Sequence, residues 1–230
     1  MIGPSDEKDA KEQERATMSE FTSGNLILNR NLEAVEAFRP TKVKTLNDEW
    51  SVFFTSRTEN RFEEPNEVLD AKSDVPVMRF DNAEDHGWEF AIVKSGKVLS
   101  RFGFLYEQET MDLVELVERL DPDADPFEDL FMNEESDQYR AEMLEKLYAE
   151  KSKQARLEEL FADFDLNAFA EFGISAEQSA ELERLFRPET FAEEDSVFEH
   201  VERFKKILGI EEMSWVSSRY EDLDDEDQVR

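Results

Sequence analysis

Three aspartates spaced two residues apart, near the middle of the sequence, could together bind a metal ion. Asp121, Asp123 and Asp125 match positions 1, 3 and 5 of an EF-hand calcium loop, which places carboxylate oxygens at this spacing. The loop also needs Gly at position 6 and a bidentate Glu at position 12, where this chain has Pro126 and Met132. We therefore reject an EF-hand and expect no metal or other cofactor at these carboxylates.

The two histidines give little support to catalysis. His86 lies beside Glu84 and Asp85, where it can act as a general acid or base, but a polar turn explains the same residues. His200 lies on an amphipathic helical segment and is expected at or near the surface. Neither belongs to an H-E-x-x-H zinc motif, and the G-x-S-x-G motif of a nucleophilic serine is absent. We expect no catalytic residues and a protein that is not an enzyme.

The strongly negative net charge is the most unusual feature of the sequence. The net charge is −31, from 58 acidic and 27 basic residues. Residues 21–106 carry 14 acidic and 11 basic residues, whereas residues 107–230 carry 38 and 13. This asymmetry argues against adaptation to high salt, which would acidify every surface. Nucleic-acid binding needs clustered Lys and Arg, so we expect a basic partner and no direct contact with nucleic acid.

The segment 107–145 concentrates this charge, with 15 acidic residues against Arg119 and Arg140. As one continuous helix it would extend about 58 Å and carry about one net charge per 4.5 Å. DNA carries about one charge per 3.4 Å along each strand, so the segment approaches a single strand and falls short of a duplex. Helices that fold back on each other would raise the density. A solvated helix face with an acidic loop is the commoner explanation of such a run.

Composition places the protein among folded chains. Hydrophobic residues make up 39% and include 19 Phe, which is enough for one sizeable core or two smaller ones in 230 residues. The absence of Cys excludes disulfides and favours an intracellular location. No apolar run approaches the roughly 18 residues that span a membrane, and the N-terminal segment lacks the apolar stretch of a secretory signal. We expect a cytoplasmic protein that does not contact membranes.

The first half has strand patterns. Alternation of apolar and polar residues predicts strands at 50–54 and 75–80, and 88–105 predicts a hairpin with its turn at Ser95-Gly96. Two short helices are also expected, at 32–38 with Asn31 as its cap and at 65–71.

From residue 107 the apolar period becomes helical. Ser175 and Gln178 form a capping box, and Gly173 is suited to end the preceding helix, which Asp165 begins. We expect Trp215 to seal the last helix against the sheet. Apolar positions at helical spacing recur in six segments, at 111–120, 139–147, 157–164, 165–172, 176–186 and 197–208.

These patterns predict an α+β protein with a small antiparallel β-sheet unit and flanking helices, followed by an acidic all-helical unit. The expected boundaries are a disordered extension at 1–24, the sheet unit at 25–106, the helical unit at 107–220 and a disordered acidic tail at 221–230.

Two segments resemble a pattern of uncharacterised bacterial proteins. GWEFAIVKSGKVLSRF is a hairpin that contains Trp, and FKKILGIEEMSWVSSRY is a closing segment of the form LGI…S-x-R-Y. The resemblance covers the hairpin and the C-terminal segment. It implies a bacterial origin and carries no activity.

Three functions are open. The first is a non-catalytic protein whose acidic half binds a basic macromolecular surface, as an immunity or anti-defence inhibitor or a nucleic-acid mimic does when it blocks a nucleic-acid-binding enzyme. The second is a structural or scaffolding protein with a merely solubilising surface, and the third a hydrolase dependent on a divalent metal. For the first, the expected contact residues are carboxylates with two apolar anchors: Asp121, Asp123, Asp125, Phe127, Glu128, Asp129, Phe131, Glu134 and Glu135.

Overall fold

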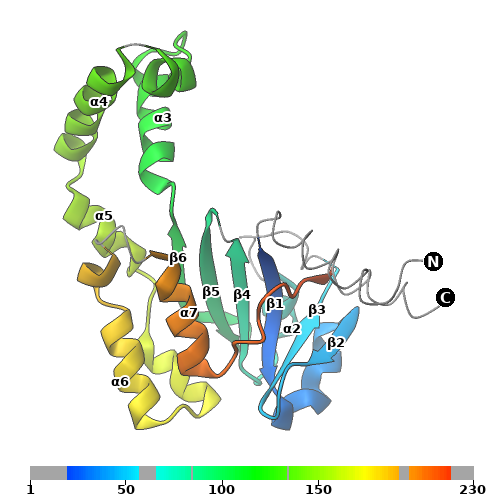
Figure 1. Cartoon of the computed structure of the whole chain (residues 1–230). Coiled ribbons are helices and arrows are strands. Elements are labelled where there is room, and N and C mark those ends of the chain that lie inside the picture. The colour runs from blue at the N-terminus through cyan, green and yellow to red at the C-terminus, as the bar shows by residue number, and fades with distance from the viewer. Residues whose placement is uncertain (1–19, 57–65, 84, 134, 192–196, 219–230) are drawn as a thin grey trace, which may run out of the picture.

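The computed structural model describes residues 20–56, 66–83, 85–133, 135–191 and 197–218, which form an α+β fold around an antiparallel sheet (Figure 1). This confirms the predicted class. Six strands lie in the order β2-β3-β1-β4-β5-β6, and each neighbouring pair is antiparallel. The strands are β1 (Phe21–Leu28), β2 (Lys42–Thr45), β3 (Trp50–Phe54), β4 (Val77–Ala83), β5 (Gly87–Lys94) and β6 (Lys97–Leu105).

The hairpin of β5 and β6 has the predicted turn. Ser95 and Gly96 have φ of 53° and 70°, as both central residues of a type I′ turn require. β4 begins at Val77, directly after Pro76, which has no backbone N–H to donate to a ladder. The strand predicted at 75–80 therefore starts later and continues to Ala83.

β1 and β2 were not predicted. β1 lies in the middle of the sheet between β3 and β4, and it begins inside the range 1–24 that we expected to be a disordered extension. Its polar residues Thr22, Ser23 and Asn25 are buried with the apolar ones, so β1 shows no alternation in the sequence.

Helices cover both faces of the sheet. The helices are η1 (Asn29–Phe38), α2 (Asn66–Ala71), α3 (Gln108–Leu120), η2 (Glu128–Met132), α4 (Ser136–Glu150), α5 (Lys153–Leu160), η3 (Leu166–Phe172), α6 (Ala176–Leu185), η4 (Pro188–Phe191) and α7 (Val197–Leu208). η1, η3 and η4 are 3-10 helices, and η2 is a single π-helical turn.

The larger core joins one face of the sheet to the C-terminal helices. Phe90 stacks on Phe204 of α7 with ring centroids 5.0 Å apart, and Phe102 contacts Phe186 at 4.9 Å. The opposite face packs Phe53 against Phe38 of η1 at 5.2 Å. Because residues from both predicted units form the larger core, a boundary at 106 does not separate two cores.

Most predicted helix ends are confirmed. The Asp165 side chain accepts from the Asn167 backbone N–H, Gly173 has φ of 77°, and Ser175 forms the capping box with Gln178. The cap at Asn31 is wrong: η1 begins at Asn29, three residues before the predicted start, with Leu28 at the N-cap position and no side-chain cap hydrogen bond.

Two side chains lie elsewhere than expected. His200, near the start of α7, is buried because Phe191 of η4 packs against it, with the two rings 4.5 Å apart. Trp215 is half-buried with φ of 57°, and it is Met213 and Val216 that lie in the core below α7.

The tail at 221–230, most of the N-terminal extension, Glu84 and Glu134 lie outside the described residues. In the ranges that the structure describes, no helix has both the length and the hydrophobicity needed to cross a membrane.

The packing around β1 leaves no room for a side chain at Gly24. A Cβ added there would lie 2.4 Å from Val52 Cγ2 on β3, a distance that real Cβ atoms do not adopt. We expect Gly24→Ala to destabilise the fold by about 1–3 kcal/mol through overpacking, measured by urea unfolding. Gly103→Ala is the matched control, because the nearest atoms there are 3.5 Å away. A loss for Gly24→Ala no larger than for the control would contradict the expected clash.

Candidate functional site

The acidic segment folds into an arm, defined here as α3, η2 and α4 (residues 108–150). α3 and α4 lie side by side and project away from the sheet (Figure 1). The arm has its own core, which shares no residue with the other two described cores. That core consists of Leu113, Leu116, Val117, Leu130, Met143 and Leu147. The arm therefore holds the far end of the acidic segment in a fixed shape and away from the body.

The tip of the arm, residues 120–135, is shaped by hydrogen bonds from the backbone to side chains two or three residues away. Asp121 Oδ1 accepts from the Asp123 backbone N–H at 3.2 Å. Asp125 Oδ1 accepts from the backbone N–H groups of Phe127 and Glu128 at 3.2 and 3.1 Å, which starts the η2 turn. Two of the three aspartates with calcium-loop spacing thus stabilise turns, a common use of Asp in loops. π-helical turns occur often at functional sites.

Large apolar side chains are exposed on this tip. Met132 is 79% exposed, Phe127 62%, Leu120 55% and Phe131 36%. The rings of Phe127 and Phe131 lie 6.2 Å apart, and the guanidinium of Arg140 lies 6.0 Å from the Phe131 centroid. Only Leu130 of the η2 turn points into the arm core. Exposed apolar side chains gathered at one projecting end are typical of interaction sites.

The carboxylates of the tip are not neutralised by the chain's own cations. None of the described tip carboxylates takes part in an ion pair with another described residue. On the arm's flanks some carboxylates do, since Arg119 pairs with Glu150 at 2.7 Å and Lys146 with Glu142 at 2.8 Å, while Glu115, Glu118 and Glu145 form no ion pair with a described residue. The described tip carboxylates are Asp121, Asp123, Asp125, Glu128, Asp129 and Glu135. The tip therefore carries these six carboxylates with no Lys or Arg among residues 120–135.

The structure brings the expected contact residues together on one tip, with Glu134 outside the description. Leu120 and Met132 are also exposed within the tip and were not among the expected contact residues. Leu120 was predicted only as the end of a helical apolar repeat, and Met132 was named only at position 12 of the rejected calcium loop. Both side chains are more than half exposed, which the sequence does not reveal.

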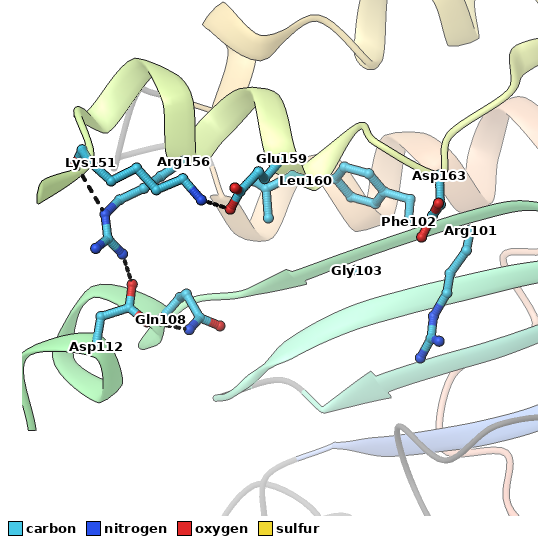
Figure 2. A pocket seen from close by; sticks show the side chains of 10 residues that line it. All are labelled: Arg101, Phe102, Gly103, Gln108, Asp112, Lys151, Arg156, Glu159, Leu160 and Asp163. Carbon is cyan, nitrogen blue, oxygen red and sulfur yellow. Dashed lines mark hydrogen bonds and ion pairs between the residues drawn. The ribbon is translucent and has the colours of Figure 1, made fainter. Parts of the chain in front are cut away.

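A cleft lies where the arm joins the body. Two cavities of about 460 and 390 Å³ share Arg156 of α5 and Asp112 of α3, which form an ion pair. Figure 2 shows the larger cavity with this pair. Lys151 pairs with Glu159 beside them. Arg101 also lines the larger cavity, and its guanidinium lies 3.5 Å from the Glu89 carboxylate on β5. Each of these charges has an internal partner, so the cleft holds the base of the arm together and offers no excess charge.

A buried polar network lies on the sheet face that carries η1 and α2. Arg79 donates to Asp81 at 2.6 and 2.8 Å and to Ser23 Oγ at 2.8 Å. Glu89 lies opposite Asp81 on the next strand, and Arg101 Nη2 lies 3.5 Å from it. Burial, and then the charge of Asp81, raise the pKa of Glu89 to about 7, partly opposed by the arginines.

Little supports catalysis at the histidines. His86 lies in the turn before β5, exposed, with Nδ1 3.6 Å from Glu107. In the described ranges, no group of three His, Asp or Glu side chains could hold a metal ion.

Comparison with protein-family models, with curated proteins and with solved structures finds no match to this chain. The resemblance of the hairpin and the C-terminal segment to bacterial proteins, and the bacterial origin it implied, gain no support from these comparisons.

Proposed function

We propose that this chain is a non-catalytic protein that binds a basic macromolecular surface through the tip of its arm. The observation that carries the proposal is the combination of unneutralised carboxylates and exposed apolar side chains on one projecting turn. None of the described tip carboxylates pairs with a described cation, whereas Glu142 and Glu150 on the flanks do. Partners of this kind include nucleic-acid-binding enzymes, which an immunity or anti-defence inhibitor would block.

A surface that serves only to keep the protein in solution fits the tip less well. Carboxylates alone improve solubility, and exposed Phe and Met side chains reduce it. Phe127 and Met132 are more than half exposed among these carboxylates. An interface has this composition, with apolar anchors at its centre and charges around them. The tip therefore favours binding over the scaffolding alternative.

Electrostatic attraction would bring the partner to the tip. Opposite charges accelerate association, and salt weakens this effect because the Debye length is only about 10 Å at 0.1 M. Apolar contacts then slow dissociation. The partner should thus bind strongly at low salt and much less at high salt.

Two variants with equal charge test the role of the tip. The tip variant combines Asp123→Asn, Glu128→Gln, Asp129→Asn and Glu135→Gln, and it keeps the two aspartates that stabilise turns. The body variant combines Glu36→Gln, Asp48→Asn, Glu49→Gln and Asp70→Asn, all exposed on the sheet unit. We expect the tip variant to bind the partner roughly tenfold more weakly and the body variant to bind it normally.

The measurement is a pull-down from the native host at low and at high salt, followed by titration of the recovered basic protein with each variant. Recovery of no basic protein at either salt concentration would contradict the proposal. Equal weakening by both variants would contradict the assignment to the tip, because only net charge would then matter.

A further inference from the structure

We propose that the partner's site combines Lys or Arg with aromatic side chains, the chemistry of grooves that bind single-stranded nucleic acid. The arm tip would occupy such a groove in place of the strand. This inference rests on the proposed function and narrows it, since a basic surface without aromatic side chains would satisfy the function alone.

The aromatic pair of the tip supplies what a simple acidic patch lacks. Phe127 directly precedes η2 and Phe131 lies on it, with ring centroids 6.2 Å apart and both rings exposed. Grooves for single strands bind bases by stacking them on aromatic side chains, and any flat ring can take part. The two rings can therefore occupy positions that bases otherwise fill.

Charges flank these rings on the same stretch of chain. Asp123 and Asp125 precede the pair, and Glu128 and Asp129 lie between its members. A single strand likewise alternates negative groups with flat rings, and its groove combines a basic track with stacking platforms. A duplex differs, because its bases are stacked inside and its binders contact phosphates and groove edges. The exposed rings thus point to a single-strand groove rather than to a duplex-binding surface.

Other occupants of the tip fit less well. Nucleic acid and anionic membranes are repelled by the tip carboxylates. A second copy of the chain would place like charges opposite each other, because the protein carries −31 overall. Charge complementarity leaves a basic partner, and the exposed rings give that partner its aromatic character.

Two synthetic peptides separate charge from stacking. One alternates Lys with Trp, the other alternates Lys with Ala, and both have the same length and charge. Calorimetric titration of the full chain at low salt should show that the Lys-Trp peptide binds about tenfold or more tightly than the Lys-Ala peptide. In the double variant Phe127→Ser with Phe131→Ser this preference should disappear, while the affinity for the Lys-Ala peptide stays unchanged.

Met111→Ser is the matched control, because Met111 is 50% exposed on α3 and outside the tip. It should keep the preference for Trp, and far-UV circular dichroism should show that every variant is folded. Equal binding of both peptides to the unaltered chain, or a preference that survives in the double variant, would overturn the aromatic groove and leave the proposed function standing. If neither peptide binds at low salt, the proposed function itself fails.

Discussion

Replacing Leu130 by Asp is expected to unfold the arm while the sheet and its covering helices stay folded. Leu130 is fully buried, and it is the only residue of η2 in the arm core. An unpartnered carboxylate in this position costs several kcal/mol, which a core of six side chains cannot offset. Because the arm core shares no residue with the larger core, the loss should stop at the base of the arm.

The positions of the tryptophans make this loss measurable. All three, Trp50, Trp88 and Trp215, lie outside the arm, so tryptophan fluorescence reports only the body. Far-UV circular dichroism should lose the helical signal of α3 and α4, which have 13 and 15 residues. Leu120→Asp, at a position that is 55% exposed, should change neither signal. A parallel loss of fluorescence would show that arm and body fold as one unit.

The same variant connects the fold to the proposed function. The tip lies at the end of the arm that is remote from the sheet (Figure 1), so the arm core holds Phe127, Phe131 and their carboxylates together. An unfolded arm keeps every charge of the wild-type arm and adds one, but it loses the fixed arrangement of its rings. Binding that survives Leu130→Asp would therefore depend on charge only, whereas binding that is lost requires the folded tip.

The sequence predicted those elements whose signals are local. The Ser95-Gly96 turn, the Ser175–Gln178 capping box and the helix ended by Gly173 each depend on residues within a few positions, and the structure has all three. The acidic tip could be proposed as a contact surface for the same reason, because its charged and aromatic residues are close together in the sequence.

Features that depend on distant contacts could not be predicted. β1 lies between two strands and buries polar residues such as Asn25, so it lacks the alternation that marks a strand. The helical period of α3 and α4 shows that each has an apolar face, but the same faces could pack on the sheet. Only the structure shows that they pack on each other and that Met132 stays exposed.

Arg79, Asp81 and Glu89 illustrate the same limit. Each alternates with core residues along its strand, which normally places a charged side chain in solvent. All three are buried, with exposed fractions of 5%, 0% and 9%. Because Glu89 is buried and lies beside the charge of Asp81, its pKa is about 7, well above the usual 4.5 of a glutamate.

Glu89→Gln should therefore change how stability depends on pH. The folded protein binds the Glu89 proton more tightly than the unfolded chain does, so this proton stabilises the fold below about pH 4.5 and the effect is lost as pH rises through 7. The pKa difference between the two states corresponds to a loss on the order of 3 kcal/mol. Gln keeps the shape and the neutral state of protonated Glu, so the variant should lack this part of the loss.

Urea unfolding of both proteins at about pH 5 and about pH 8 measures the effect as a difference, which removes the contribution of all other carboxylates. The quantity compared is the unfolding free energy of Glu89→Gln minus that of the wild type. This difference should be larger at about pH 8 than at about pH 5, by up to about 3 kcal/mol. Glu49→Gln, at an exposed position beside β3, should show the same difference at both values. Parallel loss of stability in the wild type and in Glu89→Gln would mean that Glu89 is ionised in the fold across this range, with Arg101 and Arg79 outweighing both burial and Asp81.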